Sequence, residues 1–340
     1  MPIGLPNLIF KVRESNMRNF LVCDGGGTKT DFLIFNEKAE ILSYYKNAGT
    51  NALFIDEEKA INNVIEGINE CIEKARLSIK DLELVCLFIP GFENCIHKIK
   101  KRISIKNIKC LSDVNNAFFG AMGKSYGIVV LSGTGSFAVG ISKDNRKVVS
   151  GGWGPLIGDK GSGYHIGIMC LEKLAYFYDN DIKDSKLRKI FLEKFGIEDE
   201  YKIREIIYSS DFGREDVAKI SKIVAEAAKE NDKDAIDILR RAAKELVELV
   251  ITLNRKLNYE KLPVSLIGGV TNIGDLFINI FKEELSVKCK NLYYENPKYD
   301  PLIGATLYVL LKEANIDIER DKEVLNNLSK YRRDYSYVNG

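Results

Sequence analysis

The sequence predicts an α/β protein built from two similar halves. Short apolar runs typical of buried strands alternate with amphipathic helical patterns, which is the arrangement of an α/β fold. Residues 21–43 and 129–150 repeat one order of features: an apolar strand, a glycine turn with hydroxyls, a second strand, a charged turn and a third strand. A chain of 340 residues has room for roughly two domains. We therefore expect an internally duplicated chain.

The first half predicts a strand hairpin, a helix and two further strands. Strands are expected at 19–25 (NFLVCDG), at 30–36 (TDFLIFN) and within 37–45. A helix is expected from Asp56 to about Leu77, because its apolar residues recur at helical spacing. The near-continuous apolar run at 82–91 is typical of a strand covered on both faces, and a short strand is expected at 106–114.

The second half begins with the repeated strands at 129–150. The glycine-rich segment GGWGPLIGDKGSG (151–163) ends at Ser162, which we expect to cap a helix running through Cys170 to Tyr178. Residues 182–258 read as charged, amphipathic helices. A strand, a double glycine and a helix start are expected at 261–274, and a closing helix at 300–314.

Composition excludes several classes of function. Fifty basic and 48 acidic residues leave a formal charge of +2, without the excess typical of a nucleic-acid surface. The longest apolar stretches are shorter than the roughly 20 residues that cross a bilayer, so no membrane span is expected. In residues 97–109 lysines alternate with isoleucines as in a strand, which we interpret as a solvated face in preference to a polyanion site.

The ends and the cysteines point to a cytoplasmic protein. Residues 1–16 lack the features of a signal peptide, and we expect a disordered leader or a start codon assigned too early. The seven cysteines are scattered without a C-x-x-C pair and are expected to be buried, reduced thiols, without disulfides or structural metal. His97 and His165 have no matching ligand cluster, and no chemistry is assigned to them.

The stretch VCDGGGTKT (22–30) raises the question of a phosphate site. It fits neither a Walker A loop nor a dinucleotide fingerprint, because a strand and not a helix follows the glycines. Small residues at a hairpin tip let backbone N–H groups approach an anion. A plain reversing turn is the simpler interpretation of one such hairpin. Two of them, one in each half, favour a nucleotide held between the halves.

A set of motifs carries a family resemblance over about residues 19–314: DGGGTKT (24–30), SDV (112–114), SGTGS (132–136), GGWGPLIGDKGSG (151–163) and IGGV (267–270). The sequence resembles the sugar kinase/actin/Hsp70 ATPase superfamily, and within it the N-acetylglucosamine kinases and the BadF/BadG/BcrA/BcrD ATPases. The resemblance implies two ribonuclease H-like domains, an ATP cleft between them, Mg²⁺ and phosphoryl transfer to a sugar hydroxyl. We expect the domains at 17–114 with about 303–320 and at 115–302, followed by a tail at 321–340.

The resemblance also implies roles for single residues. Asp113 matches the catalytic base that takes the hydroxyl proton, with a helix N-cap as the alternative. Asp24 matches a residue that holds Mg²⁺ through water, with a turn aspartate as the alternative. The positions that match the ATP site are Asp24, Gly26, Gly27, Thr28, Lys29, Thr134, Gly135, Gly268 and Gly269.

The positions that match the sugar site are Asn51, Asp113, Ser136, Gly152, Trp153, Gly154 and Asp159. The simpler alternatives are a loop asparagine for Asn51, a helix-capping aspartate for Asp159 and a core residue for Trp153. The chain departs from the pattern at Lys160, where amino-sugar kinases usually carry an acidic residue. This departure changes the charge beside the expected sugar.

The expected function is ATP-dependent phosphorylation of an N-acetylated hexosamine. N-acetylglucosamine, phosphorylated at its 6-hydroxyl, is the first candidate, followed by N-acetylmuramic acid and glucosamine. Two other classes stay open. An activator ATPase of 2-hydroxyacyl-CoA dehydratases or benzoyl-CoA reductases would bind an iron–sulfur cluster through cysteines at a dimer interface. A nucleotide switch would bind ATP without sugar-stimulated turnover. A homodimer is also left open.

Overall fold

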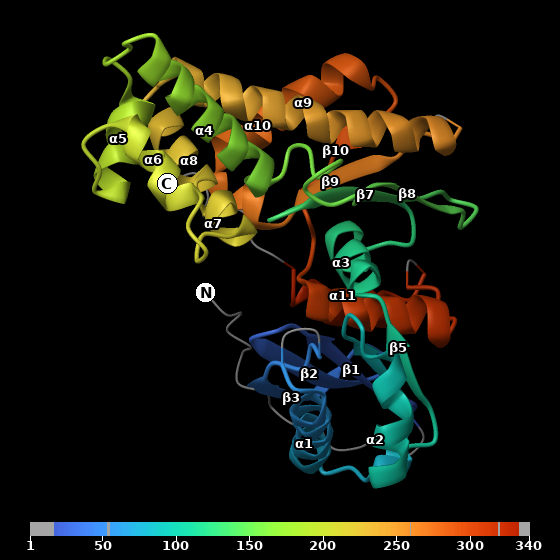
Figure 1. The fold of residues 1–340 in the computed structure, drawn as a ribbon. Coiled ribbons are helices and arrows are strands. Elements are labelled where there is room, and N and C mark those ends of the chain that lie inside the picture. Colours follow the sequence, from blue (N-terminus) through green and yellow to red (C-terminus); the bar gives the residue numbers. More distant parts are fainter. Residues whose placement is uncertain (1–16, 53–54, 259, 319, 333–340) are drawn as a thin grey trace. The chain divides into compact units, whose positions relative to one another are not determined.

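The chain folds into two compact units, each with its own sheet (Figure 1). The computed structural model describes residues 17–52, 55–258, 260–318 and 320–332. The predicted leader at 1–16 lies outside the described residues. Among the described residues, the first unit combines 17–124 with 298–332, and the second comprises Ser125–Pro297.

The first unit contains a five-stranded sheet in the order β3-β2-β1-β4-β5. Its strands are β1 (Asn19–Gly25), β2 (Lys29–Asn36), β3 (Ile41–Ala48), β4 (Leu82–Phe88) and β5 (Ile108–Leu111). Its helices are α1 (Glu57–Ala75), α2 (Ile96–Arg102), α3 (Asp113–Met122), α11 (Pro301–Tyr308) and α12 (Lys322–Ser329). Short 3₁₀ turns lie at Ile79–Asp81 and Glu93–Cys95, and a π-helical turn, Val309–Glu313, follows α11.

The local sequence explains helix α1 and the central strands of the first sheet. Asp56 accepts a hydrogen bond from the Lys59 amide (3.0 Å) and so caps α1, whose buried face includes Ile61, Val64 and Ile68. Strands β1 and β4 pair in parallel at the centre of the sheet, and both are almost wholly buried. The predicted helix and strands are confirmed.

The basic run 97–109 differs from its predicted conformation. Residues 97–102 belong to helix α2, and only Ile108–Leu111 form a strand. The strand-like alternation was misleading, because Ile96, Ile99 and Ile103 also recur at helical spacing and lie on the less exposed side. Lys100, Lys101 and Arg102 are exposed, as expected of a solvated face.

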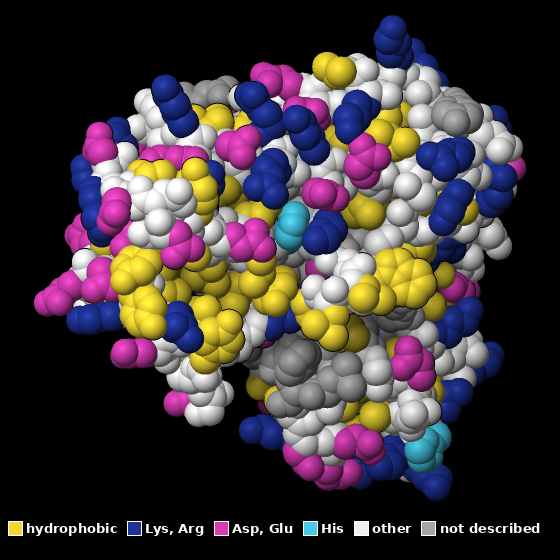
Figure 2. Space-filling model, turned by 45° about the horizontal axis from the view of Figure 1, so that its top comes forward, with side chains coloured by type: hydrophobic (Ala, Val, Ile, Leu, Met, Phe, Trp, Pro, Cys, Tyr) yellow, Lys and Arg dark blue, Asp and Glu magenta, His cyan; other side chains and the backbone are white. Residues whose placement is uncertain are grey.

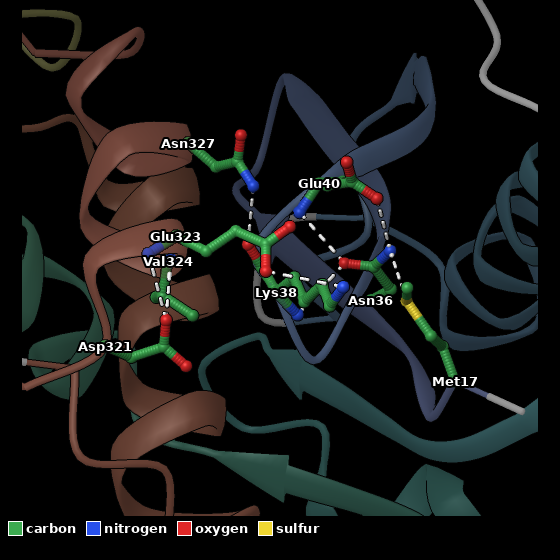
Figure 3. Close-up of polar contacts among 8 residues, drawn as sticks. All are labelled: Met17, Asn36, Lys38, Glu40, Asp321, Glu323, Val324 and Asn327. Carbon is green, nitrogen blue, oxygen red and sulfur yellow. Dashed lines mark hydrogen bonds and ion pairs between the residues drawn. The ribbon is translucent and has the colours of Figure 1, made fainter. Parts of the chain in front are cut away.

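Helix α12 belongs to the first unit, although residues 321–340 were predicted to be a tail. The Asn327 amide donates to the Lys38 carbonyl (2.9 Å), and Lys38 pairs with Glu323 (3.3 Å) (Figure 3). The turn that α12 contacts is closed by Asn36, whose side chain accepts from the Glu40 amide (3.0 Å) (Figure 3). The helix is thus fixed to the β2–β3 turn through its polar face.

The second unit contains a five-stranded sheet in the order β10-β9-β6-β7-β8. Its strands are β6 (Gly127–Ser132), β7 (Ser136–Ile141), β8 (Lys147–Gly151), β9 (Pro263–Ile267) and β10 (Tyr293–Tyr294). Its helices are α4 (Gly163–Asp179), α5 (Lys186–Phe195), α6 (Ile203–Ile207), α7 (Arg214–Lys219), α8 (Ser221–Lys229), α9 (Lys233–Lys256) and α10 (Asp275–Lys288). Short 3₁₀ turns lie at Glu200–Lys202 and Gly269–Ile273.

The two sheets share one topology, which confirms the predicted duplication. In the first, β1, β2 and β3 are antiparallel neighbours and β1 also pairs in parallel with β4, which pairs in parallel with β5. In the second, β6 takes the place of β1, with β7 and β8 antiparallel on one side and β9 and β10 parallel on the other. The sheets differ in the crossover to the fourth strand, which is α1 in the first unit and α4–α9 in the second.

The unit boundaries differ from the predicted domains. Residues 115–124 and 298–302 fall in the first unit, because α3 and α11 pack closely there. A β-carbon at Gly304 would lie 1.9 Å from the Asn116 carbonyl oxygen, so only glycine permits this approach. Helix packing thus keeps both segments with the first sheet.

The surface and the core agree with the composition. Lysine and arginine side chains are interspersed with aspartate and glutamate over much of the face in Figure 2. Six of the seven cysteines are buried and Cys110 is half-buried. Among the described residues, no helix combines the length and apolar character needed to cross a bilayer.

Candidate functional site

The turn between β1 and β2 is held by the segment that follows β3. A β-carbon at Gly25 would lie 2.3 Å from the Thr50 Oγ1 atom, and one at Gly49 would lie 2.1 Å from the Gly27 carbonyl oxygen. The Gly26 carbonyl accepts from the amides of Thr50 (3.0 Å) and Asn51 (3.2 Å). The glycines therefore let two loops meet backbone to backbone, and this contact places Asn51 beside the predicted phosphate turn.

Asp24 occupies an acidic, partly buried position at the end of β1. The Asn116 amide donates to its Oδ1 atom (2.7 Å). The pKa of Asp24 is raised to about 6, mainly by burial and also by the charges of Asp31, Asp300 and Asp113, while the hydrogen bond from Asn116 opposes the shift. The structure thus gathers negative charge around Asp24.

This environment fits a hard cation. Carboxylate oxygens are the ligands that Mg²⁺ prefers, usually with several waters retained. Within the described part of the chain, no cluster of three or more His, Cys, Asp or Glu side chains is arranged to hold a metal by itself. A magnesium ion held by Asp24, water and substrate phosphate is compatible with both observations.

Asp113 is the first residue of α3 and does not cap it. Ser112 fills the capping position, since its Oγ atom accepts from the Val114 amide (3.3 Å). The N-cap alternative for Asp113 is therefore wrong. Its side chain is exposed, and partial desolvation raises the pKa of its carboxyl above the usual value. An exposed carboxyl with a raised pKa can accept a proton from a bound hydroxyl.

In the second unit, the turn between β6 and β7 is held by the Asp159–Gly161 turn. Ser132 and Ser136 face each other across the hairpin, and the Gly133 amide donates to the Gly135 carbonyl (2.9 Å). The Ser132 hydroxyl donates to the Gly161 carbonyl (3.0 Å), and the Ser136 hydroxyl donates to the Lys160 carbonyl (2.6 Å). The hairpin hydroxyls are thus used to fix a neighbouring loop.

Asp159 is buried, with 5% of its surface exposed, and has a positive φ of 53°. Its Oδ1 atom accepts from the Ser136 amide (3.2 Å), and its Oδ2 atom pairs with Arg214 Nη2. Ser162 caps α4 as predicted, accepting from the His165 amide (3.2 Å). The helix-capping alternative for Asp159 is therefore wrong.

His165 supports the same turn. Its Nδ1 atom accepts from the Gly161 amide (3.0 Å), which requires a neutral imidazole. Burial and the positive charges of Lys160 and Arg241 lower the pKa of His165 to about 4. The bond therefore persists across physiological pH.

The remaining predicted positions lie on two glycine-rich segments of the second unit. Trp153 is 72% exposed, so the core alternative for it is wrong. Gly268 follows β9 with a φ of 103°, and a β-carbon there would lie 2.3 Å from the Ser132 carbonyl oxygen. The β9 segment thus lies directly against the second hairpin.

Each unit assembles its own share of the predicted residues. The first holds Asp24, the 26–29 turn, Asn51 and Asp113, while the second holds residues 134–136, 152–154, Asp159, Gly268 and Gly269. Lys29 is exposed and pairs with Asp31 (3.5 Å) within the first hairpin.

Sequence reasoning missed three residues that touch these groups: Asn116, His165 and Arg214. Asn116 lies one helical turn after Asp113, a spacing that places both near one end of α3 and could have indicated it. Arg214 is 55 positions from Asp159 and gave no local signal.

Comparison with known protein families identifies the family of this chain. The profile of the BadF/BadG/BcrA/BcrD ATPase family matches residues 23–309. The chain belongs to this family of ATPases, which the motifs predicted.

Two curated relatives are similar over most of the chain. One is an N-acetylmuramic acid/N-acetylglucosamine kinase of Clostridium acetobutylicum, 27% identical over 86% of this chain and 98% of its own length. The other is an N-acetyl-D-glucosamine kinase of Dictyostelium discoideum, 27% identical over 86% of this chain and 97% of its own length. Both relatives are carbohydrate kinases, the enzyme class that the sequence predicted.

A solved structure confirms the fold class. A Chromobacterium violaceum protein assigned provisionally as an N-acetylglucosamine kinase superimposes with a TM-score of 0.64 at 21% identity, covering 86% of this chain and 99% of its own. At this identity the likeness speaks for the fold alone.

Proposed function

We propose that the protein transfers the γ-phosphate of ATP to a hydroxyl of an N-acetylated amino sugar, with N-acetylglucosamine phosphorylated at its 6-hydroxyl as the first candidate. The observation that carries this proposal is the pair of glycine hairpins at equivalent places in the two sheets. Carboxylates accompany the first and a braced glycine-rich loop accompanies the second. The kinase activities named for the two relatives support it.

An enzyme that transfers a phosphoryl group must position the reacting groups and neutralise the charge of the phosphates. We assign Asp113 as the base, because its exposed carboxyl has a raised pKa and can take the proton of the sugar hydroxyl. Asp24 would hold Mg²⁺, which supplies positive charge to the phosphates when bound. Residues 26–29 and 134–135 form the two turns that would face the phosphates. Gly269 would leave room for the nucleoside, because a β-carbon there would meet no atom closer than 3.9 Å, whereas Gly268 is required by its close contact with the Ser132 carbonyl.

The sugar is assigned to the residues braced beside each hairpin. Asn51 and Asp159 are buried and fixed by backbone or ionic contacts, so both can present oriented polar atoms to neighbouring hydroxyls. Trp153, exposed on the glycine-rich loop, would form an apolar wall against the sugar. The buried thiols are compatible with a reducing compartment, and we propose the cytoplasm.

The test is a coupled ADP-release assay with MgATP and a panel of hexoses and their N-acetyl derivatives, with Asp113→Asn as the blank. We expect turnover with N-acetylglucosamine or N-acetylmuramic acid that the variant loses. ADP release that no sugar stimulates would contradict the proposal. Iron analysis then separates the remaining classes: bound iron would indicate an activator ATPase, and its absence with retained ATP binding a nucleotide switch.

A further inference from the structure

Arg214 is carried by a helix whose position is fixed at the backbone level. Helix α7 packs on α4 so closely that a β-carbon at Gly167 would lie 2.0 Å from the Val217 carbonyl oxygen. One at Gly163 would lie 3.4 Å from the Ala218 carbonyl oxygen, and the Gly163 amide itself donates to the Gly133 carbonyl (2.8 Å). Helix α7 is therefore locked, through the start of α4, to the β6–β7 hairpin.

The Arg214 side chain reaches the tip of that hairpin. A β-carbon at Gly135 would lie 2.7 Å from Arg214 Nη2 and 2.8 Å from Asp159 Oδ2. The ion pair thus lies against the glycine of the predicted phosphate turn. Asp159 is 5% exposed in its side chain and Arg214 is 42% exposed, so the pair joins a buried carboxylate to a half-exposed cation.

A buried carboxylate depends strongly on such a partner. Removing one member of a buried pair leaves a charge without compensation and is costly. A carboxylate offers about four acceptor sites, of which the Ser136 amide and Arg214 use two. Asp159 can therefore be held by both and still accept from a ligand.

We propose that Arg214 is a positioning residue for the sugar site, holding the Asp159 carboxylate in a fixed orientation against the β6–β7 hairpin. This inference rests on the proposed function, in which Asp159 binds sugar hydroxyls. It assigns a role to a residue that lies outside every sequence motif.

The experiment measures KM for N-acetylglucosamine, KM for MgATP and kcat in Arg214→Met, Arg214→Lys, Asp159→Asn and the Asp159→Asn/Arg214→Met double variant. Lys219→Met is the matched control, because Lys219 is also on α7 and pairs with an acidic residue, Asp216 (2.7 Å). Circular dichroism checks that each variant is folded.

We expect Arg214→Met to raise the sugar KM at least about tenfold, because the buried carboxylate loses its ionic partner and with it its fixed orientation. The KM for MgATP should change less than about threefold. Arg214→Lys should recover part of the sugar KM, because it keeps the charge but not the planar fork. The double variant should match Asp159→Asn alone, because both changes act through one carboxylate.

Three results would overturn the inference. A sugar KM within twofold of the wild type in Arg214→Met would do so, as would multiplicative effects in the double variant. If Arg214→Met does not fold, Arg214→Lys and its double variant with Asp159→Asn replace it, and effects on the sugar KM that multiply would also count against the inference. A wild-type protein that phosphorylates no amino sugar instead refutes the proposed function, and the inference with it.

Discussion

The two glycine hairpins hold equivalent places in their sheets but are supported in different ways. The β1–β2 turn is braced by residues 49–51 of a nearby loop, mainly through backbone atoms. The β6–β7 turn is braced by the 159–161 turn through side chains, including Asp159, Ser136 and the distant Arg214. The topology of the two halves is repeated, whereas the chemistry that supports their turns is not.

The electrostatics of the two regions also differ. Around the first hairpin, burial and neighbouring carboxylates raise the pKa of Asp24 to about 6. Around the second, burial and the positive charges of Lys160 and Arg241 lower the pKa of His165 to about 4. This contrast suits the proposed roles, in which the first unit supplies the cation ligand and the base.

The largest effect is expected at Asp113, the residue of the first unit that we propose as the catalytic base. Asp113→Asn should lower kcat by about three orders of magnitude or more, because an amide cannot take the hydroxyl proton. Sugar affinity should stay within about tenfold. Single-turnover kinetics and equilibrium sugar binding measure the two quantities. Normal turnover in this variant would remove Asp113 from the role of base.

The second-largest effect is expected in the segment that follows β9. It tests whether the glycines there are required by contacts with the protein backbone or by a bound ligand. Gly268→Ala should destabilise the fold by roughly 3 kcal/mol, because a positive φ and a contact with the Ser132 carbonyl both oppose a side chain. Gly269→Ala is the matched control. Its β-carbon would find no atom closer than Gly133 Cα at 3.9 Å. Urea unfolding should separate the two variants.

The ATP affinity of the same control refines the test. If the nucleoside passes Gly269, Gly269→Ala should weaken MgATP binding while stability stays within about 0.5 kcal/mol of the wild type. Equal destabilisation of both variants would show that the segment is constrained by the fold alone. Unchanged ATP affinity in Gly269→Ala would remove this glycine from the nucleotide site.

The third effect concerns the pH dependence of the first unit. The folded-state pKa of Asp24, about 6, lies above the usual aspartate value of 3.8, so the folded protein binds the proton more tightly than the unfolded chain. The resulting stability is present below about pH 4 and is lost as the pH rises through about 6. Relative to Asp24→Asn, the wild type should lose about 2 kcal/mol between pH 4 and 7.5. Urea unfolding of both proteins at these pH values measures the difference.

The same ionisation should appear in cation binding. Below about pH 6 Asp24 becomes protonated and is a poorer Mg²⁺ ligand, so MgATP affinity should fall there in the wild type. Asp24→Asn should bind MgATP weakly at every pH. A stability difference between the two proteins that does not vary with pH would contradict the raised pKa.

Much of the fold could be predicted because it depends on residues that are close together in the sequence. The strand hairpins, the Asp56 and Ser162 caps and the repeat at 129–150 all depend on residues close in the chain. The strand-like prediction for residues 97–102 was wrong, because the isoleucines there fit both the strand period and the helical period. The place of α12 depends on the long-range bond from Asn327 to the Lys38 carbonyl, which no local pattern reveals.

The candidate site divides in the same way. Glycine turns and their acidic neighbours were visible as motifs, whereas Asn116 and Arg214 act across 92 and 55 positions. The sequence predicts no chemistry for His165, because a histidine without ligand partners gives no metal signal. Its contact with the Gly161 amide depends on the geometry of the loop it faces.

The smallest effect concerns Lys160, which adds positive charge to the second region. Its side chain is exposed, and its charge helps lower the pKa of His165. Because Arg214 already compensates the Asp159 carboxylate, Lys160 gives the 159–161 turn a net positive charge. Lys160→Glu should make this net charge negative. We expect KM for N-acetylmuramic acid, which carries a carboxylate, to rise about fivefold relative to neutral N-acetylglucosamine, a size consistent with exposed charges.

Two further readouts decide whether charge is the cause. High salt should shrink the difference, since exposed charges are screened within about 10 Å at 0.1 M. The pKa of His165 should rise in Lys160→Glu, because a positive neighbour is replaced by a negative one, and an NMR titration measures this directly. Lys229→Glu, an exposed change on α8, should alter neither quantity. If the preference between the two sugars does not respond to Lys160→Glu while the His165 pKa rises, the charge reaches the turn but not the substrate, and Lys160 is then a tolerated variation in the loop.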